Sequence, residues 1–314
     1  MTAPSWRELD DAAREREVSP SSCIGGNYQP FIAAYAERSA QARARANAEG
    51  SGRLNLRYGP GAAQLLDLFL PPAAGPVGGA GVPALLVFIH GGYWQELSKD
   101  ESSFAAPQCV AQGIAFAAVN YTLAPSATVA EMVAECRLAI AWLHANAAAL
   151  GFDARRIVVA GSSAGAHLAA MVALPPQGPP LAPAFAPTPA PALSPMDAPL
   201  RLRGAVLVSG IYELEVLLGT SVNEALGLTA DSARALSPAL LPLRGFPPSI
   251  VCWGEVETAE FKRQSQGFAA CLQGAGTSCQ RFEMPQRNHF DVILDLADPA
   301  TMLGAATLAL VSLG

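Results

Sequence analysis

A strand, a tight glycine-rich turn and a helix follow one another between residues 157 and 173, and this succession constrains the fold most strongly. The apolar run at residues 157–160 (IVVA) reads as a buried strand, GSSAG follows at residues 161–165, and a helix-forming run continues over residues 166–173. In this context the pattern G-x-S-x-G is typical of a nucleophile elbow, where a sharp strand-to-helix turn exposes one serine. Glycine is favoured there because the backbone approaches itself closely. Ser163 is therefore the candidate nucleophile.

A second glycine-rich turn, His90-Gly91-Gly92, follows an apolar run at residues 84–89 that reads as a buried parallel strand. Such a turn at the carboxyl end of a strand is typical of an oxyanion hole, since glycine lets backbone N–H groups approach a substrate oxygen. We predict that the N–H groups of Gly91 and Gly92, joined by that of Ala164, form this oxyanion hole. The alternative is a tight turn without chemistry, which the nearby elbow motif disfavours.

The general base is expected among only four histidines in the chain. His144 lies within an alanine-rich helical run, where a core or surface role is expected. His167 stands four residues after Ser163 on the following helix, so it would point along that helix rather than at the serine. His90 belongs to the oxyanion turn and reads as a structural hydrogen-bonding residue. His289 follows the last predicted strand, where the base belongs in the order serine, acid, histidine.

The orienting acid is expected on the loop after the apolar run at residues 249–253. An acid there would fix the tautomer of the catalytic imidazole. Glu257 stands in the middle of this loop, whereas Glu260 begins a helical run and reads as a first-turn charge favoured by the helix dipole. Asp291 is a rival, although it would have to curl back sharply to reach His289 from two residues away. We predict Glu257.

The substrate pocket is expected beside the two turns. Tyr93 and Trp94 follow the oxyanion glycines and would give it aromatic walls, and Ser162 precedes the nucleophile. The N–H of Tyr93 is a further candidate oxyanion donor. Packing in the core is the alternative for both aromatic rings, and for Trp94 it is equally favoured because tryptophan is so often buried.

Five segments together resemble one family. The chain is similar to α/β-hydrolases of the arylformamidase (kynurenine formamidase) branch, near the hormone-sensitive-lipase-like carboxylesterases. The resemblance covers most of the chain from about residue 65 onward and is carried by HGGYW at residues 90–94, NYTLAP at 120–125, GSSAGAH at 161–167, EFKRQS at 260–265 and HFDVI at 289–293.

The resemblance implies a serine nucleophile, no metal or other cofactor, and N-formylkynurenine as the best-known substrate. One departure is Glu257, since the family usually carries aspartate there, and the extra methylene would need a small shift of the loop. The ligand clusters of the histidine-rich, metal-dependent bacterial formamidases are absent. We therefore expect a serine hydrolase that cleaves an aryl formamide or small amide through an acyl-enzyme, with an aromatic acyl or formyl compound as its small-molecule substrate. A carboxylesterase or aryl carbamate hydrolase and a non-catalytic ligand-binding relative are the alternatives.

Composition agrees with these expectations and excludes other classes. The chain has 314 residues with a net charge of −6, which argues against nucleic acid or an anionic membrane as partner. Six cysteines without C-x-x-C spacing favour free thiols in a reducing compartment, so we expect a cytoplasmic protein. Residues 1–20 lack the apolar core of a signal peptide, and no apolar stretch is long enough for a membrane span. A homodimer is left open.

Alternating strands and helices predict an α/β fold with a mostly parallel central sheet flanked by helices. We expect a helical or cap segment over residues 1–60 and an α/β-hydrolase domain over 61–314. A helix near residues 28–48 is expected, either over the active-site mouth, as the resemblance implies, or merely against the sheet edge. The proline- and alanine-rich insertion at 175–199 is either an irregular surface excursion or part of a lid. The strands are expected at 65–70, 84–89, 114–120, 157–161, 204–209, 249–253 and 279–284, and the helices at 103–112, 129–150, 260–273 and 299–313, the last with Asp298 as N-cap.

Overall fold

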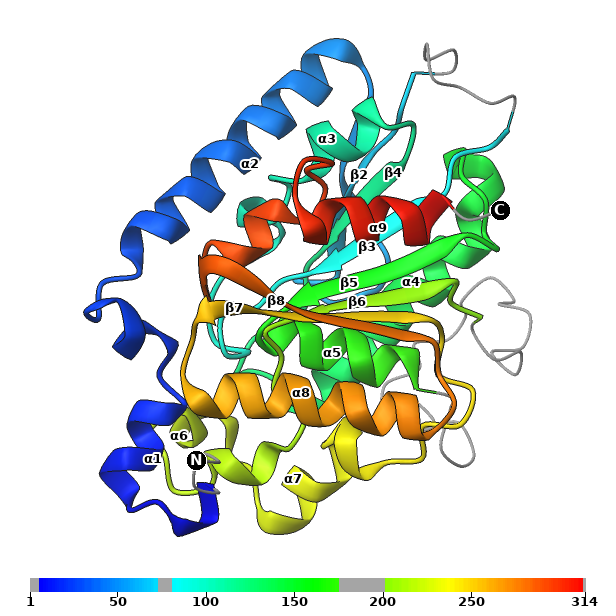
Figure 1. Ribbon diagram of the computed structural model, residues 1–314. Coiled ribbons are helices and arrows are strands. Elements are labelled where there is room, and N and C mark those ends of the chain that lie inside the picture. The colour runs from blue at the N-terminus through cyan, green and yellow to red at the C-terminus, as the bar shows by residue number, and fades with distance from the viewer. Residues whose placement is uncertain (1–5, 73–80, 175–200, 313–314) are drawn as a thin grey trace.

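A mixed eight-stranded sheet forms the centre of the computed structural model, which describes residues 6–72, 81–174 and 201–312 (Figure 1). The strand order is β1-β2-β4-β3-β5-β6-β7-β8. β1 and β2 are antiparallel to their neighbours, and the strands from β4 to β8 all pair in parallel. The strands are β1 (Gly52–Arg57), β2 (Leu65–Phe69), β3 (Leu85–Ile89), β4 (Ala115–Val119), β5 (Ile157–Ser162), β6 (Gly204–Val208), β7 (Ser249–Val256) and β8 (Cys279–Asn288).

The inner strands β3, β4, β5 and β6 are buried over their whole length. They read as continuous apolar runs because helices cover both faces of a parallel sheet. In β3, Leu85, Val87 and Ile89 enter one hydrophobic core, and Leu86 and Phe88 enter the other. The sheet therefore divides the interior into two cores, and the turns at its carboxyl edge are held on a rigid support.

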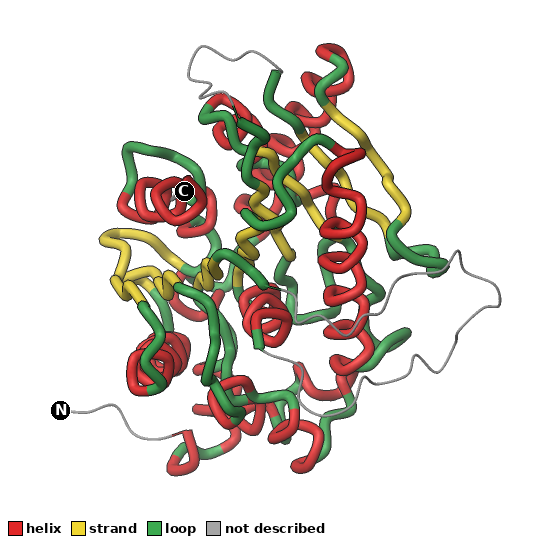
Figure 2. Tube along the Cα trace, turned by 90° about the vertical axis from the view of Figure 1, so that its right-hand side faces the viewer, coloured by secondary structure: helices red, strands yellow, loops and turns green. Residues whose placement is uncertain are grey.

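Helices form the two outer layers. α4, α5 and α8 pack on one face of the sheet, and α3 and α9 pack on the other, as the two views show (Figures 1 and 2). The α-helices are α1 (Asp11–Glu17), α2 (Gln29–Glu49), α3 (Ala106–Ala111), α4 (Val129–Leu150), α5 (Ala164–Ala173), α6 (Val222–Leu226), α7 (Ala230–Ala235), α8 (Ala259–Gly274) and α9 (Met302–Ser312). Short 3₁₀ helices lie at η1 (Trp6–Glu8), η2 (Pro20–Ile24), η3 (Lys99–Glu101), η4 (Leu214–Leu217), η5 (Pro238–Leu240) and η6 (Val292–Asp295).

A cluster of charged side chains around the buried Asp67 holds α2 against the sheet. Asp67 of β2 is fully buried, and its carboxylate is 3.0 Å from Arg43 Nε of α2 and 3.2 Å from Lys99 Nζ of η3. The N–H of Asn55 in β1 donates to the same carboxylate at 2.7 Å. A buried charge with several partners avoids the cost of desolvation without compensation. The cluster therefore fixes where α2 crosses the molecule.

The seven predicted strands are all present, but the sheet holds one more. β1 was not predicted, because its sequence GRLNLR lacks the continuous apolar run of the inner strands. Its residues are alternately half-buried and exposed, and its register is interrupted by an irregularity. β1 lies within residues 1–60, so the segment expected to be a cap contributes an edge strand to the sheet. β8 was predicted to end at residue 284 but continues to Asn288, which pairs with Val256 beyond a bulge in β8.

Two helix starts also differ from the prediction. α9 begins at Met302 rather than at residue 299, so Asp298 is not its N-cap. Asp298 instead accepts the N–H of Ala300 in a preceding turn, and the Thr301 hydroxyl accepts the N–H of Gly304 at 3.0 Å. A threonine in that position satisfies a first-turn N–H of the helix.

α3 is shorter than predicted, since it begins at Ala106 with Pro107 in its first turn, where proline is well tolerated. The helix expected near residues 28–48 is α2. The insertion at 175–199 lies outside the described residues. Within the part of the chain that the structure describes, no helix has the length and apolar character needed to cross a membrane.

Candidate active site

The turn between β5 and α5 holds Ser163 in an unusual backbone conformation. Its φ is +56° and its ψ is −123°, a region that residues other than glycine rarely occupy. A Cβ on Gly161 would lie 2.2 Å from the Gly165 carbonyl oxygen, and a Cβ on Gly165 would lie 2.1 Å from the Ile89 carbonyl oxygen. Only glycine fits at either position, so the two flanking glycines allow the sharp turn that the motif predicted.

The turn after β3 lies directly against the serine turn. A Cβ on Gly91 would stand 2.7 Å from the Ser162 carbonyl oxygen and 3.2 Å from Ser163 Cβ. Gly92 has a φ of +88°, and a Cβ there would meet the carbonyl oxygen of Glu96 at 2.4 Å. Both positions therefore require glycine, and the backbone of this turn comes close to Ser163.

Backbone N–H groups on both turns are available to a substrate oxygen. Ala164 is the first residue of α5, so its N–H has no acceptor within the helix. In the described part of the chain the N–H groups of Gly92 and Tyr93 donate to no acceptor either. The predicted donors Gly91, Gly92 and Ala164 thus come together beside Ser163, with Tyr93 as the further donor that the sequence suggested.

His90 stabilises this turn through contacts of its ring and its carbonyl oxygen. Its Nδ1 lies 3.0 Å from the Gly91 carbonyl oxygen, and its ring stacks on Tyr121 with centroids 4.2 Å apart. The Tyr121 hydroxyl donates to the His90 carbonyl oxygen at 3.0 Å. Burial lowers the pKa of His90 to about 4, so the ring is neutral near pH 7 and donates to Gly91. These contacts fit the structural role expected for His90.

His289 stands immediately after β8 and contacts Glu257 on the loop after β7. Its Nδ1 lies 3.1 Å from Glu257 Oε2, and both side chains are buried. A hydrogen bond to the carboxylate places the proton on Nδ1 and leaves the Nε2 lone pair to accept a proton. Phe261 packs edge-on against the imidazole with centroids 4.4 Å apart, which further fixes its orientation.

The other oxygen of Glu257 is held by two donors. The Ser209 hydroxyl donates to Oε1 at 2.6 Å, and the N–H of Gly254 donates to it at 2.5 Å. These bonds accommodate the longer glutamate side chain and direct Oε2 at His289. Ser209 was not singled out from the sequence. Its position directly after β6, at the carboxyl edge of the sheet, was the available signal.

The rival acid Asp291 makes a hydrogen bond within its own turn rather than with His289. Its Oδ1 accepts the N–H of Asn288 at 2.7 Å, and no hydrogen bond joins it to His289 among the described residues. Burial raises the pKa of the Asp291 carboxyl, and the hydrogen bond from Asn288 opposes this rise. The geometry therefore favours Glu257 as the partner of the imidazole.

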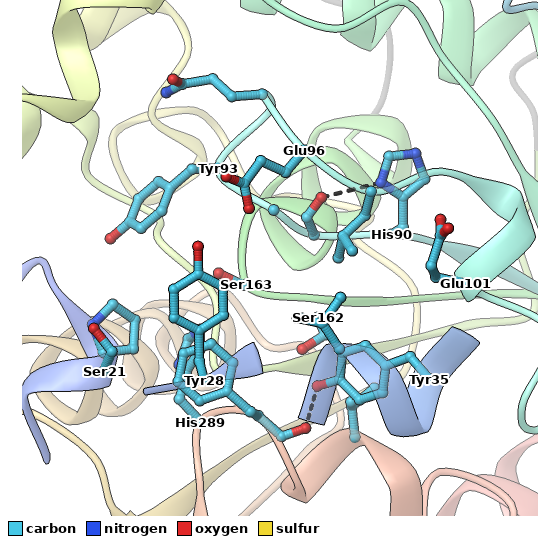
Figure 3. A pocket seen from close by; sticks show the side chains of 18 of the residues that line it. Ser21, Tyr28, Tyr35, His90, Tyr93, Glu96, Glu101, Ser162, Ser163 and His289 are labelled. Carbon is cyan, nitrogen blue, oxygen red and sulfur yellow. Dashed lines mark hydrogen bonds between the residues drawn. The ribbon is translucent and has the colours of Figure 1, made fainter. Parts of the chain in front are cut away.

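Ser163 and His289 both line one cavity of about 380 Å³ (Figure 3). No hydrogen bond joins the Ser163 hydroxyl to the His289 ring among the described residues, and such contacts are often long until substrate binds. Gly91, Gly92, Tyr93 and Ser162 also line the cavity, as the sequence predicted for a pocket beside the two turns.

Trp94 does not line this cavity, contrary to the expectation that it would form a pocket wall. Its side chain is fully buried, and its ring packs edge-on against His167 with centroids 5.1 Å apart. The chain turns at Tyr93 and Trp94, both with positive φ, which sends the two side chains in different directions. His167 Nε2 lies 2.7 Å from the Leu236 carbonyl oxygen, and His144 is exposed on α4, so neither imidazole ring is placed as a partner of the Ser163 hydroxyl.

The N-terminal segment closes one side of the cavity. Residues 18–21 line it together with Tyr28, Ile32 and Tyr35 from the start of α2. The Tyr93 hydroxyl donates to the Val18 carbonyl oxygen, and the Thr258 hydroxyl donates to that of Glu17 at 2.6 Å. The segment is thus bound to the oxyanion turn and to the start of α8. The sequence predicted an N-terminal segment near the active-site mouth, and residues before α2 line the cavity as well as those of α2.

The described residues contain no group of three or more histidine, cysteine, aspartate or glutamate side chains placed to hold a metal ion. All six cysteines are free thiols, of which Cys109, Cys136 and Cys252 are buried.

Several known hydrolases are similar to this chain in sequence and structure. A family model described as BD-FAE matches residues 66–181. The kynurenine formamidase of Danio rerio is 30% identical over 312 residues, which span 98% of each chain. A candidate thioesterase from Silicibacter sp. TM1040 is 30% identical, with a TM-score of 0.73 over 95% of this chain and 98% of that one. The esterase Est2 of Thermogutta terrifontis is 25% identical, with a TM-score of 0.61 over 83% of this chain and 90% of that one.

Proposed function

The chain belongs to the kynurenine formamidase family of α/β-hydrolases, and we propose that it cleaves an aryl formamide through a formyl ester on Ser163. Its formamidase and esterase relatives make it a hydrolase with formamidase or carboxylesterase activity. The observation that carries the finer proposal is the cavity, because Ser163, His289 and the glycines of the oxyanion turn all line it.

In the first half of the reaction, Ser163 Oγ attacks the formyl carbon while its proton passes to His289 Nε2. Negative charge develops on the carbonyl oxygen, and the N–H groups of Gly92 and Ala164 stabilise it. The C–N bond then breaks as His289 returns the proton to the departing aryl amine. Glu257 holds the imidazole in the required tautomer throughout and stabilises its charged form.

In the second half, water attacks the formyl ester and gives a proton to His289 Nε2. The same N–H groups hold the second oxyanion, and the C–O bond to Ser163 breaks as the proton returns to the serine oxygen. The products are formate and free enzyme. Tyr28, Tyr35 and Tyr93 in the cavity lining support an aromatic leaving group, since aromatic walls bury a flat ring well.

Carboxylester hydrolysis is the second candidate, because an ester passes through the same intermediates. The observation that favours it is the similarity to the Thermogutta esterase over most of the chain. The catalytic groups would be unchanged, and only the fit of the leaving group would decide between the two activities.

The test measures turnover of N-formylkynurenine, formanilide and p-nitrophenyl acetate by the full chain and by Ser163→Ala. We expect formamide hydrolysis by the parent chain and a loss of about 10⁴-fold or more in the variant. A serine-reactive phosphonate is expected to modify Ser163, which mass spectrometry of peptides detects. Ester turnover alone would replace the proposal with a carboxylesterase. Binding of the formamides without turnover of any of the three substrates would point to a non-catalytic relative.

A further inference from the structure

The catalytic cavity is lined by several acidic side chains. Glu15, Glu96 and Glu101 line it, and no lysine or arginine is among its lining residues in the described part of the chain. None of these carboxylates has a lysine or arginine within ion-pair distance among the described residues. Glu15 accepts the N–H and the hydroxyl of Ser221, and Glu101 accepts the Ser98 hydroxyl at 2.7 Å. Hydrogen bonds hold these two carboxylates without neutralising their charge.

Glu96 and Tyr28 line the cavity together. Figure 3 shows the Tyr28 hydroxyl directed toward the Glu96 carboxylate. The pKa of Tyr28 is raised, first by burial and then by the negative charge of Glu96. Because Glu96 is exposed whereas Glu15 and Glu101 are half-buried, a charged substrate meets carboxylates both near the surface and at less exposed positions of the lining.

The other residues that line the cavity indicate which groups a substrate carries besides its charge. Tyr28 stacks on Phe290 with centroids 5.3 Å apart, and Tyr35 stacks on Phe104 at 5.5 Å, so flat rings form one wall. The Ser162 side chain, only 8% exposed, also lines the cavity and has no hydrogen-bond partner among the described residues. This hydroxyl can therefore exchange a hydrogen bond with a polar group of a ligand. The lining therefore suits an aromatic compound that carries a polar group.

We propose that this cavity selects its substrate by charge, through Glu15, Glu96 and Glu101, and favours aryl formamides or esters that bear an ammonium group over those that bear a carboxylate. The inference rests on the proposed function and names the substrate class of the same site. A cation gains Coulomb energy from each carboxylate, whereas an anion is repelled by all three. Solvent and salt screen the effect most strongly at Glu96.

N-formylkynurenine carries both an ammonium and a carboxylate group, so the charge of the cavity acts oppositely on these two groups. The carboxylates of the cavity attract the ammonium, and no lining cation receives the carboxylate in the described part of the chain. Its decarboxylated amine analogue is therefore expected to be the better substrate, with kcat/KM higher by about tenfold.

The decisive experiment compares formanilide with its 4-aminomethyl and 4-carboxymethyl derivatives. A methylene separates each charged group from the ring, so the chemical reactivity of the formamide changes little. We expect kcat/KM for the cation to exceed that for the anion by about tenfold at low salt, and the ratio to shrink in 0.5 M NaCl. The ratio is then measured in Glu15→Gln, Glu96→Gln, Glu101→Gln and the triple variant.

Each single variant is expected to lower the cation-to-anion ratio by about two- to fourfold, and the triple variant to bring it near one. Glu37→Gln is the matched control, since it removes the same charge from an exposed site on α2 outside the cavity, and it should leave the ratio unchanged. Hydrolysis of all three compounds within twofold, or an equal response to Glu37→Gln, would overturn charge selection. Failure to hydrolyse neutral formanilide would instead overturn the proposed formamidase function.

Discussion

Two carboxylates lie near His289, and their separate substitution tests which of them orients the imidazole. Glu257→Gln removes the charge 3.1 Å from Nδ1 and permits the wrong tautomer, so we expect kcat/KM to fall by about 10²–10⁴-fold. Asp291→Asn retains an acceptor for the Asn288 N–H and should keep activity within about threefold. Formanilide and p-nitrophenyl acetate serve as substrates. Equal retention of activity in both variants would refute the assignment of Glu257.

Ser209 is expected to act on the reaction only through Glu257. Ser209→Ala removes the 2.6 Å hydrogen bond to Oε1 and leaves the Gly254 N–H as the remaining donor. A hydrogen bond to a charged group contributes about 1.5–3 kcal/mol, so we expect kcat to fall about tenfold, with KM nearly unchanged. In the Glu257→Gln background the same change should have little further effect. Full additivity of the two substitutions would show that Ser209 does not act through Glu257.

At the scale of residues, the sequence predicted mainly those candidate site residues that lie in a local sequence motif. Ser163, Gly91 and Gly92 each occupy a turn that neighbouring residues determine, and His289 was the histidine left after the others were assigned. Ser209 could not be found in this way, because its contact with Glu257 joins two different strand ends. Trp94 was ambiguous for a related reason, since the direction of its side chain depends on a positive φ that the sequence did not reveal.

At the scale of elements, the space around a glycine decides whether alanine can replace it. Gly165→Ala would place a Cβ 2.1 Å from the backbone oxygen of Ile89, so the junction of β3, β5 and α5 must shift. We expect a loss of at least about 3 kcal/mol in the free energy of unfolding, or failure to fold. Gly267→Ala in α8 is the matched control, because its Cβ would meet nothing within 4 Å.

The control substitution Gly267→Ala is itself expected to stabilise the protein. Gly267 lies in the interior of α8 on its exposed side, where alanine is favoured over glycine by about 0.5–1 kcal/mol. Gly267→Ala should therefore raise the midpoint of thermal unfolding and leave activity unchanged. If both alanine variants shifted stability equally, the close approach at Gly165 would not control the fold.

Helices and strands could be predicted where their signals lie in their own residues and in the residues next to them. α4 was expected at 129–150 and occurs there, because Thr128 caps its start and Gly151 ends it in a left-handed conformation. β1 escaped prediction because an edge strand needs no continuous apolar run. The extension of β8 also depends on its partner, since Asn288 pairs with Val256 of β7 only beyond a bulge in β8.

At the scale of the whole molecule, the cavity depends on segments far apart in sequence, which explains why its charge could not be predicted. Glu15 comes from α1, Glu96 and Glu101 follow β3, and His289 follows β8. The hydrogen bonds from Tyr93 and Thr258 hold the N-terminal segment against the turn after β3 and the start of α8. Net charge alone indicated an acidic protein but not where the charge gathers.

Two buried histidines make the stability of the whole molecule depend on pH. Burial lowers the pKa of both His90 and His167 to about 4, whereas an unfolded histidine titrates near 6.5. Between these values the unfolded chain binds more protons than the folded one, so stability falls as pH decreases through this window. Each histidine is expected to cost about 2 kcal/mol at pH 5 and about 3 kcal/mol at pH 4, relative to pH 7.5.

Urea unfolding of the parent chain and two glutamine variants, measured between pH 7.5 and pH 5, tests this dependence. His167→Gln keeps a donor for the Leu236 carbonyl oxygen but cannot titrate, so its stability should fall less steeply with acid, by about 2 kcal/mol over this range. His144→Gln alters an exposed histidine and should follow the parent chain. Because carboxylates titrate alike in all three proteins, the difference between the two variants isolates the buried imidazole. Parallel curves for all three would mean that His167 is protonated without opposing the fold.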